Sequence, residues 1–396
     1  MNGLQKDSVT IKPLETHLYS GSDTIRPGYA MCFDTSKSSA NDREKYVTKP
    51  SWSNLVSRNA FAGVVDSLGP VTAAGRQINL IPWDGRMYRN VNVYTDENVA
   101  AGDLLAPIPD SYYFGRAVVV DPVFEAWAAS DRSVTAGLVN GCVGRVNDNL
   151  TISRISRHVD HFRAPNVDKV VANVATGTAG HYLLNGTTAV ASLATNGSTP
   201  AGTGIGELSV VGTTTTIGQI QQAGAQWKAT AGRSIFCRQR VKIDDISDED
   251  WFFGLGTPPT VSAGVLTAVP QVTSAGTAPA GTDYMGFFFD ATGGTNTNLN
   301  FNIRKASGTQ QYVSMGLAFV NDTYIDLAFL ARNRLTGTTA GYKTVQVYVN
   351  GTLITTFNSA TQAAAFPDTV PLAWAMSGIT GGCVGTIDYL YIAQNH

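Results

Sequence analysis

The sequence has few charged residues. Lys, Arg, Asp and Glu make up 15% of its 396 residues, against about 25% in an average globular protein. The 28 basic and 30 acidic side chains nearly cancel, which leaves a formal net charge of −2. Binding to a nucleic-acid backbone draws on an excess of Lys and Arg, so we expect no nucleic acid among the partners of this chain.

Long hydrophobic runs are missing as well. A membrane-spanning helix needs about 20 consecutive apolar residues, and the sequence contains no such run. The first seven residues, MNGLQKD, are polar and lack the apolar core of a signal peptide. We therefore expect synthesis in a cytoplasm and no membrane partner.

Cysteine is scarce and scattered. The chain has four cysteines, at Cys32, Cys142, Cys237 and Cys383, without any CxxC pair. A disulfide scaffold or a zinc module would need clustered spacing. We expect buried free thiols in a reducing compartment.

The motifs of common catalytic sites are also missing. The sequence contains no G-x-S-x-G, no GxxxxGK[ST] and no HExxH. His158 and His161, with Asp160 between them, are the only clustered histidines. A metal site would need further ligands, so we interpret this segment as a strand end or a contact between domains. The sequence predicts no enzyme activity and no cofactor.

What the sequence does contain is typical of β-structure. It has 40 glycines, and short apolar runs alternate with turn residues, which predicts an all-β fold. We expect one compact β domain over residues 1–165. Its predicted strands are 29–33, 61–65, 77–81, 89–94, 115–120 and 137–146, with a short helix at 122–130.

The rest of the chain changes character twice. Residues 166–230 are rich in Ala, Gly and Thr and nearly uncharged, which predicts a linker that merges into the first strands of the next domain. Residues 231–396 contain at least eight strand-like runs and therefore predict a two-sheet sandwich. Asn350-Gly351 between the runs 343–349 and 352–357 is a strong hairpin signal.

One predicted loop is strongly acidic. Residues 244–250 read DDISDED, and the carboxylates of Asp244, Asp245 and Asp248 are of the kind that binds Ca²⁺. The spacing differs from that of an EF-hand, and loops between strands commonly carry solvated charges. The run predicts a metal site, a partner contact or an ordinary surface loop.

The last 165 residues resemble the concanavalin/laminin-G-like jelly-roll domains of tailed-bacteriophage structural proteins. The resemblance lies in an ordered series: FCRQRVK at 236–242, then DEDWFFGL at 248–255, YMGFF at 284–288, VQVYVNG at 345–351 and GTIDYLYIAQ at 385–394. A long Ala/Gly/Pro/Thr insertion at about 257–283 departs from it. The aromatic residues of this domain belong either to its core or to a sugar-stacking platform.

The N-terminal part is similar to phage head-decoration (cement) proteins, which are small β-barrel or β-tulip domains. The matching segments are RPGYAMCF at 26–33, FAGVV at 61–65, VAAGDLL at 99–105 and GCVGRV at 141–146. The resemblance implies a homotrimer on the outer capsid surface of a virion, made in the host cytoplasm, with the major capsid protein as its partner.

The resemblances leave three functions open. The first is a capsid decoration protein, with Trp83, Arg86 and Arg89 as exposed contacts, because Trp and Arg are typical of interface hot spots. In the alternative, Trp83 belongs to the core and the arginines are solvated. The second is a head fibre or adhesin that binds a host-surface glycan. The third, a glycan-cleaving enzyme, is disfavoured because no suitable carboxylate pair stands out in the sequence.

Overall fold

In the computed structural model, the chain is all-β and divides into two compact units. Unit 1 comprises Met1–Ile155 with Asn395–His396, and unit 2 comprises Ser156–Gln394. The structure describes residues 14–57, 60–66, 74–84, 88–120, 124–126, 137–143, 155–160, 170–172, 182–185, 192–194, 207–211, 218–222, 224–246, 250–257, 260–262, 265–267, 283–289, 298–305, 308–334, 342–379 and 384–396. None of the helices in these ranges has the length and hydrophobicity needed to span a membrane.

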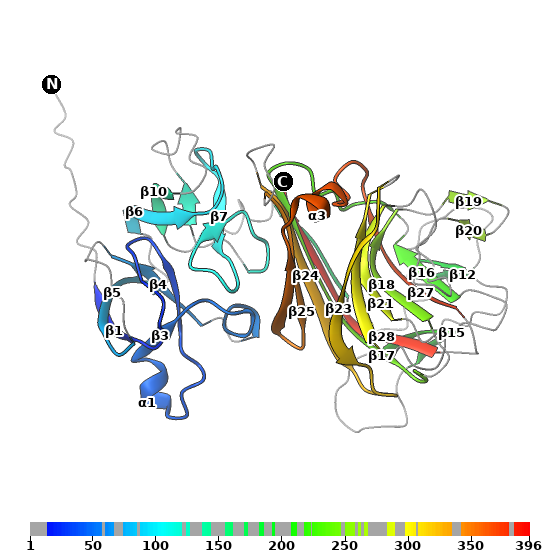
Figure 1. Ribbon diagram of the computed structural model, residues 1–396, viewed down its shortest axis with the longest axis horizontal. Helices are drawn as coiled ribbons and strands as arrows, with labels where there is room; N and C mark the ends of the chain where they lie inside the picture. Colours follow the sequence, from blue (N-terminus) through cyan, green and yellow to red (C-terminus); the bar gives the residue numbers. More distant parts are fainter. Residues whose placement is uncertain are drawn as a thin grey trace. The chain divides into compact units, whose positions relative to one another are not determined.

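Unit 1 contains two closed five-stranded barrels (Figure 1). The first barrel has the order β1-β3-β2-β4-β5, and the second has the order β10-β6-β8-β7-β9. The strands of the first are β1 (Glu15–Tyr19), β2 (Ala30–Phe33), β3 (Tyr46–Thr48), β4 (Phe61–Val65) and β5 (Gln77–Pro82). Those of the second are β6 (Tyr88–Thr95), β7 (Leu104–Pro107), β8 (Phe114–Gly115), β9 (Phe124–Ala126) and β10 (Gly137–Val143). A short helix, α1 (Ala40–Arg43), precedes β3, and a π-helical turn, η1 (Ser53–Ser57), precedes β4.

A cluster of tyrosines joins the two barrels. It consists of Tyr19 and Tyr29 from the first barrel and Tyr94, Tyr112 and Tyr113 from the second. Tyr29 stacks on Tyr112 with ring centroids 5.1 Å apart, and the hydroxyls of Tyr19 and Tyr112 are 2.7 Å apart. Burial is the main cause that raises the pKa of Tyr29 to about 12. Because hydrophobic residues of both barrels also share one core cluster, we expect the barrels to behave as one body.

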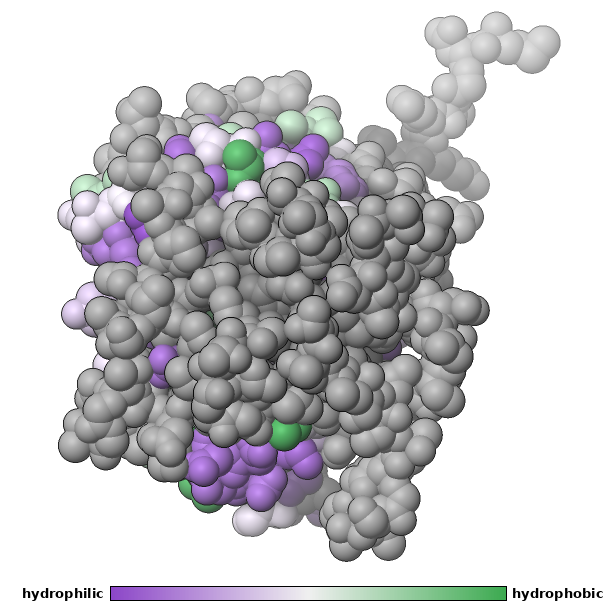
Figure 2. Space-filling view, turned by 90° about the vertical axis from the view of Figure 1, so that its right-hand side faces the viewer, coloured by the Kyte–Doolittle hydropathy of each residue, from purple (hydrophilic) through white to green (hydrophobic). Residues whose placement is uncertain are grey.

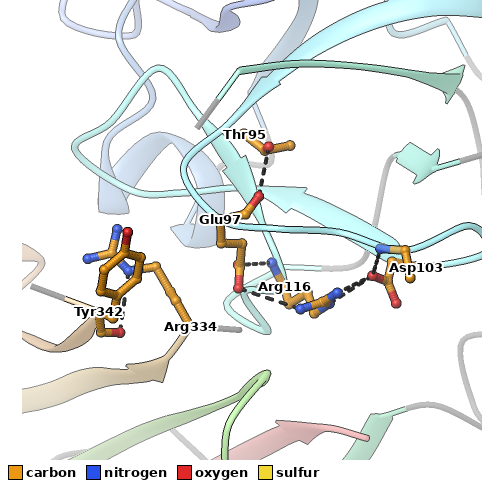
Figure 3. Close-up of polar contacts among 7 residues, drawn as sticks. Thr95, Glu97, Asp103, Arg116, Arg334 and Tyr342 are labelled. Carbon is orange, nitrogen blue, oxygen red and sulfur yellow. Dashed lines mark hydrogen bonds and ion pairs between the residues drawn. The ribbon is translucent and has the colours of Figure 1, made fainter. Parts of the chain in front are cut away.

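A buried ion cluster fixes the turn that leads into β7 (Figure 3). The Glu97 side chain is 2% exposed, and its carboxylate accepts a hydrogen bond of 2.8 Å from the backbone N–H of Arg116. The Arg116 guanidinium pairs with Asp103 and lies 3.8 Å from Glu97. Asp103 in turn accepts from the backbone N–H of Ala100. Each charge in this poorly solvated region therefore faces an opposite charge or a hydrogen-bond donor.

Unit 2 is a sandwich of two large sheets that face each other (Figure 1). The β17 sheet has the order β14-β15-β28-β17-β24-β25-β26, with β11 also paired to β28. Its strands are β11 (Ile155–Asp160), β14 (Ser192–Ala194), β15 (Glu207–Val211), β17 (Arg233–Ile243), β24 (Ile325–Asn333), β25 (Lys343–Val349), β26 (Thr352–Phe357) and β28 (Val384–Asn395). A helix, α3 (Ala360–Ala364), follows β26.

The second sheet, the β18 sheet, has the order β12-β13-β16-β27-β18-β21-β22-β23. Its strands are β12 (Val170–Ala172), β13 (Tyr182–Asn185), β16 (Gly218–Gln222), β18 (Asp250–Gly256), β21 (Tyr284–Phe289), β22 (Asn298–Arg304), β23 (Gln311–Ala318) and β27 (Ala373–Ile379). A separate hairpin pairs β19 (Thr260–Ser262) with β20 (Val265–Thr267).

The middle of the β18 sheet is buried on both faces. Every residue of β18 and β21 is buried, although alternation along a strand would bury only one side of a half-exposed sheet. On the face away from the sandwich core, the Phe252 ring lies next to Gly254 of the same strand, β18, and next to Gly286 of the neighbouring strand, β21. A Cβ on Gly254 would come within 2.5 Å of the Gly286 Cα atom. These two glycines therefore permit close approach of β18, β21 and the Phe252 ring.

A carboxylate bridges the ends of two strands from different sheets. Asp368 Oδ1 accepts a hydrogen bond of 2.8 Å from Lys305, the residue after β22. Asp368 Oδ2 lies 2.6 Å from the ammonium nitrogen of Lys343 in β25. Burial alone would raise the pKa of Asp368, but the hydrogen bonds and charges of the two lysines outweigh it and hold the pKa below its usual range. The ionised carboxylate therefore ties the β18 sheet to the β17 sheet.

Several predicted elements agree with the structure. The runs 343–349 and 352–357 are β25 and β26, and Asn350 and Gly351 between them have φ values of 49° and 79°. Both turn residues thus adopt the left-handed conformation that Asn-Gly tolerates. Five predicted strands of unit 1 correspond to β2, β4, β5, β6 and β10.

Two elements predicted in residues 115–130 were wrong. Residues 124–126 of the predicted helix form β9, which pairs with β7 and β10 and closes the second barrel. The predicted strand at 115–120 ends at Gly115, because the next residue, Arg116, is drawn into the ion cluster. In both cases tertiary contacts override a weak local preference.

Residues 166–230 contribute strands to both sheets. β13 and β16 pair with each other and with β27, and β15 pairs with β28. The segment predicted as a linker with first strands is therefore part of the sandwich wherever the structure describes it.

Candidate functional site

The outer face of the β17 sheet carries a band of basic and aromatic side chains. Along β17, Ile235, Cys237, Val241 and Ile243 belong to the sandwich core. Arg238, Arg240 and Lys242 alternate with these core positions and therefore point to the opposite face. We call this band the basic–aromatic strip; it consists of Arg238, Arg240, Lys242, Tyr324, Asp326, Asp388, Tyr389 and Tyr391.

Arg238 forms the best-defined ion pair of the strip. Its guanidinium contacts both carboxylate oxygens of Asp326, with N···O distances of 2.6–3.1 Å. The same guanidinium lies 5.3 Å from the ring centroid of Tyr389. Burial alone would lower the pKa of Arg238, but the hydrogen bonds and the charge of Asp326 raise it. The contact has the bidentate geometry that is typical of guanidinium–carboxylate pairs.

Arg240 continues the strip on the same strand. It pairs with Asp388 at 3.2 Å and lies 4.6 Å from the ring centroid of Tyr324. Its side chain is 43% exposed, whereas that of Asp388 is 5% exposed. Lys242 approaches the same Tyr324 ring at 5.1 Å. The strip thus presents planar donors and acceptors in fixed positions beside partly exposed rings.

The sequence signal for the strip is the alternation of apolar with polar or basic residues in SIFCRQRVKI at 234–243. Gln239 interrupts the apolar positions of that run and is completely buried. The structure gives the reason: Gln239 Oε1 accepts a hydrogen bond of 2.8 Å from the indole Nε1 of Trp374. Finding the strip itself required knowing that β28 and β24 flank β17, which brings Tyr389 and Asp326 alongside the arginines.

The acidic loop after β17 is placed only in part. One carboxylate oxygen of Asp244 accepts hydrogen bonds from the backbone N–H groups of Val384, at 2.7 Å, and Asp245, at 3.0 Å. Asp244 thus joins the loop to the start of β28. Asp245 is exposed, and Asp248 lies outside the described residues. Across the described part of the chain, no three His, Cys, Asp or Glu side chains form a group that could hold a metal ion.

Of the three residues predicted to contact a capsid, one is fully placed. Trp83 follows β5 and is half-buried, and its ring packs edge-on against Phe61 with centroids 5.9 Å apart. Arg89 lies in β6, but its side chain is outside the described residues, as is the whole of Arg86. The Trp83 side chain therefore both contributes to the core and reaches the surface.

Of the two clustered histidines, the structure describes only His158. His158 Nε2 lies 2.8 Å from the Tyr182 hydroxyl, which donates a hydrogen bond of 3.2 Å to Asp160. Because that hydroxyl proton is used toward Asp160, His158 Nε2 carries a proton in this arrangement. Burial is the main cause that raises the pKa of Tyr182. His161 lies outside the described residues.

Two of the four cysteines are described as free and buried, Cys32 and Cys237. Burial raises the pKa of both thiols, which keeps them protonated and unreactive. The side chain of Cys142 and the whole of Cys383 are outside the described residues.

The visible surface of the described residues is mainly polar. Figure 2 shows hydrophilic patches with hydrophobic residues as separate spots. The large hydrophobic side chains that are exposed in the described ranges are Leu14, Val159, Tyr312 and Val320. Single exposed hydrophobic residues of this kind are ordinary on protein surfaces.

No family model and no curated protein sequence matches the chain. Solved structures that resemble it include an endo-1,3-β-glucanase from Streptomyces sioyaensis, with 11% identity and a TM-score of 0.37 over 61% of this chain and 97% of that one. A carbohydrate esterase from the Shiga toxin-encoding bacteriophage phi24B has 18% identity and a TM-score of 0.33 over 54% and 90%. The Emp47p carbohydrate recognition domain has 9% identity and a TM-score of 0.36 over 61% and 97%. At these values the likenesses carry no argument about ligand or reaction.

Proposed function

We propose that this chain is a virion structural protein that binds the outer surface of a tailed-phage capsid and stabilises the shell. The observation that supports this proposal most directly is the construction of unit 1. Its two closed barrels share a core and are joined by the tyrosine cluster. The segments that resemble decoration proteins contribute to this unit, including β2 and β4.

A unit of this kind suits a cementing role for a physical reason. Closed barrels leave no free strand edges, so such a unit attaches through loops and side chains rather than by strand addition. Each attached copy buries additional area across the joints between capsid subunits. Binding to the assembled shell but not to its dissociated subunits then stabilises the shell by mass action.

The test uses shells assembled from the major capsid protein of the phage that encodes this chain. Purified full-length chain should co-sediment with the shells and raise their disruption temperature. Arg89→Ala should weaken co-sedimentation, whereas Arg26→Ala, at an exposed arginine of the same unit, should not. Equal heat resistance of shells with and without the chain would refute the cement role.

We also propose that the chain is a homotrimer, a state that fits occupancy of three-fold positions on an icosahedral shell. The monomer mass is 42.0 kDa, so light scattering coupled to size exclusion separates a trimer from a monomer clearly. A monomer in solution would contradict a preformed trimer.

The basic–aromatic strip favours a second function, binding of a host-surface glycan by unit 2. Sugar hydroxyls need donors and acceptors held in fixed positions beside apolar or aromatic surface. The Arg238–Asp326 and Arg240–Asp388 pairs provide the first, and Tyr389 provides the second. No reaction is proposed for this strip.

A glycan array probed with the full-length chain tests this second function. A bound glycan should be lost with Arg240→Ala, because Arg240 is the more exposed of the two arginines. The control variant Tyr312→Ala removes an exposed aromatic side chain from β23 of the β18 sheet and should retain binding. Absence of any signal at high avidity, or equal loss with both variants, would contradict a glycan site on the strip.

A further inference from the structure

The loop between β7 and β8, residues 108–113, attaches the second barrel of unit 1 to the first. It carries Tyr112 and Tyr113 of the tyrosine cluster. The Tyr112 hydroxyl donates a hydrogen bond of 2.9 Å to Asp23, which lies between β1 and β2. The Tyr112 carbonyl oxygen accepts one of 2.8 Å from the backbone N–H of Ala30 in β2. We call residues 108–113 the joint loop, because side-chain and backbone contacts both hold it to the first barrel.

Asp110 lies in the joint loop with a left-handed backbone. Its φ is 59°, a conformation that aspartate adopts more readily than most other residues with a side chain. Its backbone N–H donates a hydrogen bond of 2.8 Å to the carbonyl oxygen of Pro50, which lies between β3 and η1. The backbone of Asp110 is therefore also tied to the first barrel. The proposed functions assign no role to this residue, so the inference below goes beyond them.

The side chain of Asp110 lacks the partners that a buried charge needs. Its Oδ2 atom is buried and, among the described residues, accepts no hydrogen bond. The charge that acts on Asp110 is that of Lys49, but the Lys49 ammonium lies 4.0 Å from Asp23 Oδ2 and is 41% exposed. An ionised carboxylate is stable in a poorly solvated place only beside donors or an opposite charge. The neutral carboxylic acid therefore fits this place better than the carboxylate does.

The titratable groups around the joint loop leave this balance unchanged. Asp23 is itself a carboxylate, and it already accepts from Tyr112. The hydroxyls of Tyr19 and Tyr112 lie 2.7 Å apart, and burial is the main cause that raises the pKa of Tyr112, which keeps its hydroxyl neutral. Burial also raises the pKa of Asp110, and the positive charge of Lys49 offsets only part of this rise. Hydrogen bonding and electrostatics thus both favour the protonated side chain.

We propose that Asp110 is a pH-sensitive switch in the joint between the two barrels. The protonated side chain lets the joint loop stay docked on the first barrel, whereas ionisation draws the carboxylate toward water and loosens the loop. A carboxyl group whose pKa is higher in the folded than in the unfolded protein favours the folded state when protonated. The joint is therefore tightest in acid, near the unfolded pKa of about 3.9 and below it, and weakens as the pH rises through the folded pKa.

Hydrogen exchange of the full-length chain tests the switch in peptides that cover the joint loop and β8. Asp110→Asn is neutral at every pH and tolerates the left-handed backbone. At pH 7 we expect protection in this variant to exceed that in the parent by about threefold or more. At pH 3.5, where the parent side chain is protonated too, the difference should disappear. A gain of equal size at both pH values would reflect the backbone preference of asparagine, and it would overturn the proposal, as would a loss at pH 7.

Asp23→Asn is the matched control, since it removes a carboxylate of the same neighbourhood that does have partners, Tyr112 and Lys49. It should lower protection of the same peptides at pH 7, in the opposite direction to Asp110→Asn. A ¹³C NMR titration of the Asp110 carboxyl in the parent gives a reading that needs no variant. We expect a midpoint above the ordinary aspartate value of about 3.9. A midpoint at or below that value would refute the switch.

Discussion

Replacing Arg116 by methionine should destabilise unit 1 strongly. The substitution keeps most of the side-chain volume but removes the guanidinium that lies 3.8 Å from the Glu97 carboxylate, which is buried at 2% exposure. Removing one partner of a buried ion pair typically costs about 3–5 kcal/mol, because the remaining charge is uncompensated. Asp103 is 26% exposed, so water can solvate it and it contributes less to the loss.

Hydrogen exchange followed by mass spectrometry suits this prediction, because it reports on each unit separately. Since about 1.4 kcal/mol is a tenfold change in an equilibrium constant, protection in peptides from β6 and β7 should fall roughly a hundredfold or more. Peptides from β24 and β25 in unit 2 should not change. The control Arg26→Met replaces an exposed arginine of unit 1 and should shift stability by no more than about 0.5 kcal/mol.

A second variant tests the physical reason. Adding Glu97→Gln to Arg116→Met removes the buried charge, so the double variant should regain part of the lost stability. If Arg116→Met alone changes protection by less than about threefold, or if the double variant is less stable than the single one, the argument from an uncompensated buried charge is wrong.

Three further outcomes are expected. Because the pKa of Asp368 is lower in the folded protein than its usual value, its stabilising effect is present above the unfolded pKa of about 3.9. The effect is lost as the pH falls through the folded pKa. In urea titrations, Asp368→Asn should therefore be less stable than the parent at pH 7, and the two stabilities should converge in acid. Gly254→Ala would place a Cβ 2.5 Å from the Gly286 Cα atom, so the melting temperature should fall by several degrees, and an unchanged value would contradict the close approach. Gln239→Leu leaves the buried Trp374 indole N–H without its acceptor and should cost about 1–3 kcal/mol in urea unfolding.

Much of the fold can be predicted from the sequence, because most strands are marked by local signals. β21 and β25 follow apolar or alternating runs that end at turn residues, and the Asn350-Gly351 turn fixes the register of its hairpin. Helix α3, which is absent from the predicted elements, also has a sequence signal. Ser359 and Gln362 form a capping box, which is visible as Ser-x-x-Gln.

Other elements depend on contacts that no local pattern encodes. β23 was missed because only its inward positions, such as Met315, are covered, while Tyr312 is exposed and Gly316 has a φ of 63°. The same limit applies to the candidate sites. His17 looks isolated in the sequence, and only the fold brings its Nδ1 to 3.0 Å from the Glu44 carbonyl oxygen and its Nε2 to 3.4 Å from Glu15 Oε2.

The position of β28 has a consequence for how unit 2 is made. This strand, residues 384–395, lies between β15 and β17 and pairs with both. During synthesis, β15 and β17 leave the ribosome long before the strand that joins them. The sheet therefore keeps an open slot, with two unpaired edges, until residues 384–395 have emerged. Unit 1 has by then been synthesised almost completely and can fold first. A ribosome that stalls before residue 384 would thus release a chain with intact barrels and a split, aggregation-prone sheet.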